Sequence, residues 1–231
     1  MAYGRYDCAL IDLEHGPGSY LDAIAMMQAL KGSGCVPLAR VPSNDAVAIK
    51  RILDAGVAGV MVPGGDTAEQ ARAAVSACRY PPQGRRGTAA TIVRASGYGR
   101  DVAAYQAKIN DALLVICQIE SRQAVENVEE IAAVEGLDLR VIGPMDLAAD
   151  LGHLGEPDAP AVRDCITRVE QAAKAAGKLI GSIGTPARPA PALLEAGYHL
   201  VIGDADSQLL RLAADASLAR IAAAKTARRK G

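Results

Sequence analysis

The residue types best suited to chemistry in this sequence come directly after short apolar runs. Two carboxylates and an imidazole, those of Asp12, Glu14 and His15, lie together immediately after the apolar run 8–11. A histidine beside acidic residues at the end of a strand can act as a general base. The same composition also describes a solvated loop at the start of a helix, where acidic side chains are favourable. From the residues alone, both interpretations of the segment stay open.

Two more carboxylates and one arginine follow other apolar runs. Glu120 comes after the run 113–119, Asp146 follows the run 139–142, and Arg40 comes directly after the run 36–39. If the first two runs form adjacent parallel strands, their carboxylates can share one ion, and oxygen ligands select a hard divalent cation such as Mg²⁺ or Mn²⁺. Taken singly, either acid is more simply a helix cap or an ion-pair partner. Arg40 supplies a positive charge for a carboxylate or an enolate oxygen.

The positions of the lysines indicate whether the protein could form a Schiff base with a substrate. A Schiff-base enzyme needs a lysine just after a strand of a barrel, within reach of its substrate. Six lysines lie on helices or ahead of strands and never just after a predicted strand: Lys31, Lys50, Lys108, Lys174, Lys178 and Lys225. The sequence also contains no GxSxG elbow, which disfavours acyl-enzyme chemistry. We therefore expect no Schiff-base lysine.

Apolar runs alternate with helical patterns along the whole chain. The runs are nearly continuous in their hydrophobicity, as strands buried on both faces of a parallel sheet should be. The predicted strands cover 8–11, 36–39, 59–62, 113–117, 139–142, 179–181 and 198–202, and the predicted helices cover 19–31, 45–54, 66–79, 123–134, 161–176, 189–196 and 207–224. This alternation predicts a parallel α/β sheet, either wound open or closed into a barrel.

The position of the polar residues favours the barrel. No glycine-rich segment has the complete GxGxxG spacing and no Walker loop is present, so the sequence predicts no nucleotide cofactor. Chemistry spread over the carboxyl ends of many strands is typical of a (β/α)₈ barrel, and a chain of 231 residues is within its size range. We expect one barrel domain over residues 1–231. A stretch over 80–100 lacks periodicity, and we interpret it as a long functional loop rather than as a stray strand at 88–93.

Composition excludes several classes of protein. The formal charge is −1 and the chain contains neither Phe nor Trp, so neither electrostatic attraction nor aromatic stacking favours a nucleic-acid partner. No apolar run is long enough to span a membrane, and charged residues interrupt the N-terminal apolar stretch, which argues against a signal peptide. The five cysteines are widely spaced without a CxxC pair. We therefore expect a cytoplasmic protein without a membrane partner, whose cysteines serve as small buried hydrophobes.

Six motifs in a fixed order resemble one known family. They are Leu10-Ile11-Asp12-Leu13-Glu14-His15-Gly16, Ala39-Arg40-Val41-Pro42, residues 49–56, Arg79-Tyr80-Pro81-Pro82 with residues 84–87, Gln118-Ile119-Glu120 and Ile142-Gly143-Pro144-Met145-Asp146-Leu147. Together they resemble the HpcH/HpaI aldolase family, over a span from Tyr6 to about Ala222. Its members are class II, metal-dependent pyruvate aldolases of 2-keto-3-deoxy sugar acids and of 2,4-dihydroxyhept-2-ene-1,7-dioate, the latter in aromatic compound catabolism.

The resemblance implies a role for each matching residue. Glu120 and Asp146 would be the metal ligands, for Mg²⁺ or Mn²⁺ with Co²⁺ as a further option, and Arg40 would contact the pyruvate oxygen. His15 would be the acid and base, oriented by Asp54. Gln118 would line the pyruvate pocket, and the backbone around Gly143, Pro144, Met145 and Asp146 would hold the carboxylate of the keto acid. Asp54 and Gln118 are implied by the family alone.

The resemblance implies a reaction in which a 4-hydroxy-2-keto acid is reversibly cleaved to pyruvate and an aldehyde through a metal-stabilised enolate. Three alternatives stay open: a CoA-ester lyase of the citrate lyase β or malyl-CoA lyase type, another barrel enzyme acting on a metal-bound keto acid, and a silent paralogue kept as an assembly partner. Family members are commonly homohexamers that exchange their last helix, here 207–224. The loop 80–100 and a neighbouring subunit would then build the aldehyde pocket.

The strand count differs from that of a complete barrel. Only seven strands are recognisable, and family members carry a further β/α unit of some thirty residues before the segment equivalent to 6–12. We therefore expect a TIM-type (β/α)₈ barrel that lacks its first β/α unit. Unpaired strand edges would flank the gap, while every expected catalytic residue lies after it.

Overall fold

The computed structural model describes residues 2–230, and of residues 227–230 it describes only the backbone. The chain divides into two compact units, Met1–Val201 and Ile202–Gly231. The first unit contains the strands that carry the predicted site, up to the start of the last strand. The second unit is mostly one helix, α10 (Asp206–Lys230).

Seven parallel strands form a single sheet in the order β1-β2-β3-β4-β5-β6-β7. Their bounds are β1 Cys8–Asp12, β2 Val36–Arg40, β3 Gly59–Val62, β4 Leu114–Ile119, β5 Leu139–Ile142, β6 Leu179–Ile183 and β7 Leu200–Ile202. Each strand therefore lies beside the next one in the sequence, and the sheet curls as in a TIM-type barrel from which one β/α unit is missing. The predictions of the fold class and of seven strands are confirmed.

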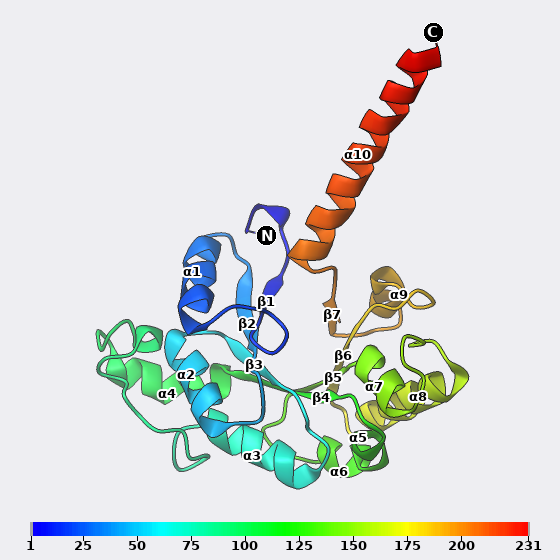
Figure 1. Ribbon diagram of the computed structural model, residues 1–231. Coiled ribbons are helices and arrows are strands. Elements are labelled where there is room, and N and C mark those ends of the chain that lie inside the picture. Colours follow the sequence, from blue (N-terminus) through cyan, green and yellow to red (C-terminus); the bar gives the residue numbers. More distant parts are fainter. Residues whose placement is uncertain (1, 231) are drawn as a thin grey trace. The chain divides into compact units, whose positions relative to one another are not determined.

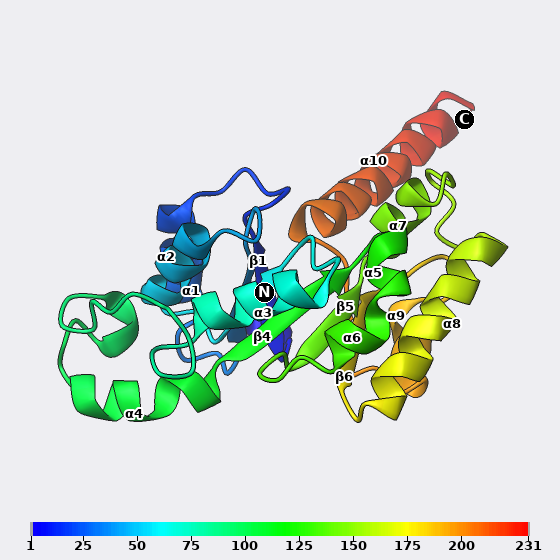
Figure 2. The same ribbon diagram turned by 90° about the horizontal axis from the view of Figure 1, so that it is seen from below.

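Helices connect the strands and cover the outside of the curled sheet (Figure 1). They are α1 Tyr20–Leu30, α2 Ala46–Ala55, α3 Ala68–Cys78, α4 Val102–Ala112, α5 Arg122–Glu126, α6 Val128–Ala132, α7 Pro144–Asp150, α8 Pro160–Ala175 and α9 Ala190–Glu195. Seen from below in Figure 2, α3, α6 and α8 follow one another around the sheet, and contacts join α3 to α6 and α6 to α8. Within the described residues, no helix is both long and apolar enough to cross a membrane.

Side-chain alternation gives the sheet two different faces. In β4, Val115, Cys117 and Ile119 belong to the hydrophobic core that joins the sheet to the helices. The residues between them, Ile116 and Gln118, therefore face the inside of the curl. By the same alternation, every second residue of each strand points to the inside of the curl. The strand geometry alone therefore sets whether a polar residue at a strand end points inward or outward.

Local signals fix where several helices begin. Asp45 caps α2 by accepting hydrogen bonds from the amides of Val47 and Ala48. Thr67 caps α3 through a capping box with Gln70. A side chain that satisfies these otherwise unpaired amides typically stabilises a helix by about 1 kcal/mol. The caps therefore set the lengths of the connections that follow β2 and β3.

Three helical segments differ from the sequence-based expectation. The single helix predicted over 123–134 is two short helices, α5 and α6, because Asn127 leaves helical geometry and donates a side-chain hydrogen bond to the Asp66 carbonyl. Helices α4 and α7 are not among the predicted helices. Most of the stretch 80–100 is irregular, with one 3₁₀ turn at Arg94–Ser96, and residues 88–93 form no strand.

Candidate active site

All the predicted site residues except Asp54 gather at the carboxyl ends of four strands, β1, β2, β4 and β5. Ala39 and Val41 pack in the outer core, so Arg40 between them points inward. By the same alternation Asp12 and Gln118 point inward from β1 and β4. Active sites of α/β barrels lie at this end of the strands. The fold thus directs these polar side chains into one region.

A tight turn after β1 is organised by the Asp12 carboxylate. Its Oδ1 accepts hydrogen bonds from the amides of Glu14 (3.0 Å) and His15 (3.3 Å). A Cβ atom on Gly16 would lie 2.2 Å from the Asp12 carbonyl oxygen, so only glycine fits there. The segment predicted from its composition to hold a base is therefore a closed turn with His15 exposed on it.

Arg40 lies between the two acidic residues of that turn. Asp12 and Arg40 are register partners in the β1–β2 pair. The guanidinium donates from Nε to Oδ1 of Asp12 (2.9 Å) and from Nη2 to Oδ2 (2.7 Å). Glu14 Oε2 lies 3.0 Å from Nη1 but accepts no directed hydrogen bond from any described residue, so this contact is an ion pair only. Two carboxylates therefore hold the orientation of Arg40.

Glu120 and Asp146 converge on Gly143, which follows β5. A Cβ atom at Gly143 would lie 3.2 Å from Glu120 Oε2 and 3.7 Å from Asp146 Oδ2. Both carboxylates therefore approach one point, and the missing side chain leaves room for them. Glu120 Oε1 is anchored by the amide of Gly64, which donates to it over 3.1 Å, and Gln118 Nε2 donates to Oε2.

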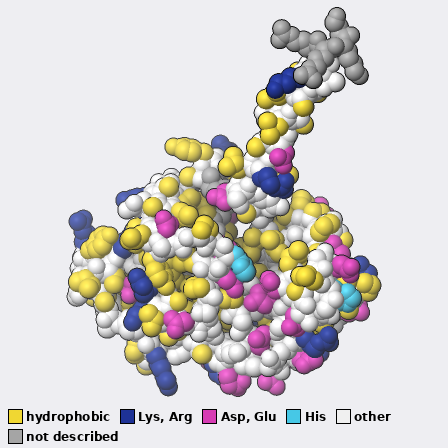
Figure 3. Space-filling model, viewed as in Figure 1, with side chains coloured by type: hydrophobic (Ala, Val, Ile, Leu, Met, Phe, Trp, Pro, Cys, Tyr) yellow, Lys and Arg dark blue, Asp and Glu magenta, His cyan; other side chains and the backbone are white. Residues whose placement is uncertain are grey.

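The carboxylates of Glu14, Glu120 and Asp146 lie close enough to one another to affect the pKa values of Glu14 and Glu120. Burial raises the pKa of Glu120, and the carboxylates of Glu14 and Asp146 raise it further. Burial also raises the pKa of Glu14, more than the Arg40 guanidinium lowers it. Figure 3 shows acidic side chains beside a histidine near the middle of this face. Carboxylates that raise one another's pKa carry excess negative charge, which a cation would relieve.

The donors present fit a divalent cation held by two carboxylates. Glu120 and Asp146 supply hard oxygen atoms, and Gln118 Oε1 is buried without a hydrogen-bond partner among the described residues. No group of three or more His, Cys, Asp or Glu side chains that could hold a metal occurs in the described part of the chain. Such a site leaves coordination positions for oxygen atoms from water or substrate.

Helix α7 begins directly behind this carboxylate pair. Pro144 occupies its first turn, and the first intrahelical bond there runs from the Leu147 amide to the Gly143 carbonyl. The amides of Met145 and Asp146 precede that bond and therefore lack intrahelical acceptors. Met145 is half exposed. These two amides are therefore available as donors at the start of α7.

Asp54 is the one predicted site residue that the structure places elsewhere. It lies at the end of α2, just before the amino end of β3, whereas His15 follows the carboxyl end of β1. The strands are parallel, so the two residues lie at opposite ends of the sheet, separated by about the 15 Å length of a five-residue strand. Asp54 instead accepts a hydrogen bond from the buried Arg86 over 2.8 Å. The predicted contact between Asp54 and His15 is not made within one chain.

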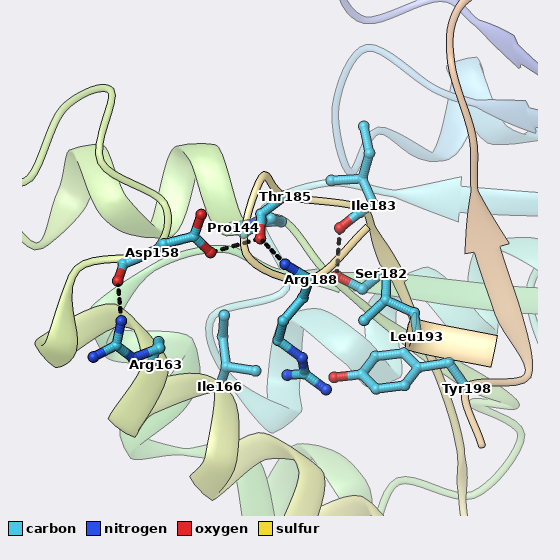
Figure 4. A pocket seen from close by; sticks show the side chains of 10 residues that line it. All are labelled: Pro144, Asp158, Arg163, Ile166, Ser182, Ile183, Thr185, Arg188, Leu193 and Tyr198. Atoms are coloured by element: carbon cyan, nitrogen blue, oxygen red, sulfur yellow. Dashed lines mark hydrogen bonds between the residues drawn. The ribbon is translucent and has the colours of Figure 1, made fainter. Parts of the chain in front are cut away.

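A hollow between α8 and the segment after β6 is a feature that the sequence did not point to (Figure 4). Asp158 accepts hydrogen bonds from the Thr185 hydroxyl (2.6 Å) and the Ala187 amide (3.1 Å). The amide of Arg188 donates to the Thr185 hydroxyl over 3.1 Å. These bonds occupy the hollow and fix the segment after β6. Its lining shares only Pro144 with the predicted site.

Curled parallel strands with a carboxylate pair and a clamped arginine at their carboxyl ends are the arrangement expected of an α/β-barrel enzyme. Comparison with known proteins gives the class. A family model described as HpcH/HpaI aldolase/citrate lyase matches residues 1–213, and the chain belongs to this family.

Individual relatives agree with the family. The chain is 41% identical over 210 residues to 2-dehydro-3,6-dideoxy-6-sulfogluconate aldolase of Pseudomonas putida, covering 91% of this chain and 82% of that protein. It is 39% identical over 220 residues to hydroxypyruvate/pyruvate aldolase of Chromohalobacter salexigens, covering 95% and 86%.

A solved structure supports the same assignment. A family protein from Burkholderia cenocepacia superimposes with a TM-score of 0.89 at 36% identity, covering 95% of this chain and 87% of that one. The chain is therefore a class II aldolase, a carbon–carbon lyase, and the predicted family and enzyme class are confirmed.

Proposed function

We propose that the enzyme reversibly cleaves a 4-hydroxy-2-keto acid to pyruvate and an aldehyde with Glu120 and Asp146 as ligands of Mg²⁺ or Mn²⁺, and Co²⁺ as a further option. The observation that carries this proposal is the convergence of two carboxylates on Gly143, at 3.2 and 3.7 Å from one point. A divalent cation held there would supply Lewis acidity that stabilises negative charge on the keto-acid oxygens.

Arg40 would stabilise the enolate oxygen that develops when the C3–C4 bond breaks. A guanidinium has five N–H donors, and two of those on Arg40 are donated to Asp12, while the contact with Glu14 is an ion pair without a directed hydrogen bond. The remaining donors are available to a substrate oxygen. Because Arg40 is held before substrate arrives, it would need little reorganisation during the reaction.

His15 would move the proton of the C4 hydroxyl group. In cleavage it would accept this proton, directly or through water, and in condensation it would return it. The turn around Asp12 supports this role, because it holds the backbone of His15 while the imidazole stays exposed. Gln118 would line the pyruvate pocket beside Glu120, and the amides of Met145 and Asp146 would bind the substrate carboxylate.

Asp54 can orient His15 only from a neighbouring copy of the chain, because within one chain the two lie at opposite ends of the sheet. The proposal therefore includes a homo-oligomer, a hexamer by family resemblance, in which sites form between subunits. Helix α10 would be the exchanged element, and the loop 80–100 would line the aldehyde pocket. Five free thiols support a cytoplasmic location, since the cytosol keeps cysteines reduced.

Subunit mixing tests the role of Asp54. His15→Ala and Asp54→Asn are each expected to lose activity about a hundredfold. Co-expression of the two variants on differently tagged chains should recover activity in the doubly tagged oligomers, because some interfaces combine an intact His15 with an intact Asp54. Doubly tagged oligomers as inactive as their parents would rule out a shared site.

Exchange of the pyruvate methyl protons with D₂O tests the proposed chemistry without knowledge of the aldehyde. We expect exchange in the presence of Mg²⁺ or Mn²⁺, loss of exchange after EDTA treatment, and recovery when the cation is restored. Proton exchange reports enolate formation, so EDTA-resistant exchange would contradict the cation role. Absence of exchange would favour a CoA-ester lyase or a silent paralogue.

A further inference from the structure

Asp12 connects the Arg40 guanidinium with the turn that carries His15. Its carboxylate accepts two hydrogen bonds from the Arg40 guanidinium, of 2.9 and 2.7 Å. The oxygen Oδ1 also accepts the amides of Glu14 and His15, at 3.0 and 3.3 Å. One carboxylate therefore fixes both the arginine and the turn that presents the histidine.

The backbone reinforces this arrangement. Asp12 and Arg40 are register partners at the ends of β1 and β2, so the carboxylate and the guanidinium start from adjacent positions. The Leu13 amide donates to the Arg40 carbonyl over 2.9 Å, which continues the pairing one residue further. Gly16 closes the turn against the Asp12 carbonyl. Neither the arginine nor the turn can shift without loss of a contact to Asp12.

Glu14 contributes less to the placement of Arg40. It makes a single 3.0 Å ion pair without a directed hydrogen bond. A two-donor contact between arginine and a carboxylate fixes the plane of the guanidinium, whereas one ion pair does not. The Arg40 side chain is 18% exposed, so few water molecules could replace a lost partner.

We infer that Asp12 is a positioning residue for enolate formation: it aligns Arg40 with the developing enolate oxygen and holds the His15 turn in register with it. This inference rests on the proposed roles of Arg40 and His15. Asp12 itself would not contact the substrate, because both of its oxygen atoms are engaged by Arg40 and the turn. Its effect on rate passes through the geometry of Arg40, where a displacement of about 1 Å can cost a hundredfold in rate.

The variant Asp12→Asn separates the two contacts of the carboxylate. An amide has one acceptor oxygen and one NH₂ group, so it can keep the backbone turn only by placing its oxygen at the Oδ1 position, which turns the NH₂ group toward the Arg40 Nη2 donor. We expect pyruvate proton exchange to fall about tenfold to a hundredfold at saturating pyruvate. The same change at Asp7, an exposed residue just before β1, serves as the matched control and should leave exchange unchanged.

A double-mutant cycle shows whether Asp12 acts through Arg40. Arg40→Lys keeps the positive charge but lacks the planar fork that Asp12 aligns. In that background, Asp12→Asn should lower exchange less than about threefold, because the alignment is already lost. An equal factor in both backgrounds, or no loss in the parent enzyme, overturns the inference.

Two controls keep the result interpretable. Thermal unfolding should show that Asp12→Asn is folded. If it is not, Asp12→Glu takes its place in the same double-mutant cycle, because it keeps the charge but lengthens the side chain. We expect pyruvate proton exchange to fall severalfold in Asp12→Glu. A parent enzyme that exchanges no protons with Mn²⁺ present overturns the proposed function and the role of Asp12 together. Normal exchange in the parent with additive losses overturns the role of Asp12 alone.

Discussion

Replacement of Glu120 by glutamine is expected to lower cation-dependent pyruvate proton exchange about a thousandfold or more, because the variant loses an anionic ligand whose charge stabilisation amounts to several kcal/mol. The substitution keeps the size of the side chain, so Gly64 and Gln118 retain a neighbour of the same shape. Binding of Mn²⁺, measured by calorimetry, should weaken in parallel. The two measurements together distinguish loss of the cation from loss of a later step.

Glu130→Gln on α6 provides the matched control for this prediction. Glu130 is exposed and follows the same strand β4, so the same chemical change outside the site should leave exchange and Mn²⁺ binding as they are. An unchanged exchange rate in Glu120→Gln would show that Glu120 is not a ligand. Weaker Mn²⁺ binding with full exchange at saturating Mn²⁺ would limit its role to affinity.

Arg40→Ala is expected to reduce pyruvate proton exchange about a hundredfold to a thousandfold, the loss typical of removing a preorganised donor from a developing oxyanion. The loss should appear in kcat more than in KM for pyruvate, because the enolate carries more negative charge than the ketone. The variant also leaves Asp12 and Glu14 without their cation, so the turn that carries His15 should loosen.

Two further variants separate these effects of Arg40. Arg40→Lys restores the charge and should recover part of the exchange, whereas Arg72→Ala, which removes an exposed arginine of α3, should have no effect. The role of Arg40 in stabilising the enolate would be contradicted by exchange at the parent rate in Arg40→Ala. A proportional rise in KM with unchanged kcat would assign Arg40 to ground-state binding instead.

The sequence predicts the strands better than the helices that lie between them. Short, continuous apolar runs such as that of β4 are typical of strands buried on both faces, and the structure contains a strand at every predicted position. Helix α4 was missed because it buries no residue and therefore carries no apolar stripe. Helix α7 has only seven residues and follows Gly143 and Pro144, which on their own indicate a turn.

The site was predictable where it depends on strand ends and not where it depends on distant contacts. Arg40 ends a strand, and Glu120 and His15 come just after strands, so the topology alone brings all three to one end of the sheet. The clamp on Arg40 could not be inferred, because it depends on the register of β1 against β2. Asp54 could not be placed from the sequence for a different reason. It lies at the end of a helix and therefore far from His15 in one chain, and a sequence motif does not reveal that distance.

Neighbouring side chains in β4 point to opposite faces of the sheet, so the packing of the core and the position of the site depend on the same strand register. A slip of one residue in the pairing of β4 would turn Gln118 and Glu120 into the helix layer and expose Cys117 and Ile119 to the interior. Gly59 favours the native register, because a Cβ atom opposite Leu114 would lie 2.8 Å from Leu114 Cβ, and a slip would bring Ala58 or Val60 to that position. A chain in the wrong register would therefore lose its hydrophobic core and the proposed site residues Gln118 and Glu120 in one event. Quality control that removes poorly packed chains would remove inactive enzyme as well, and specific activity should follow the natively folded fraction.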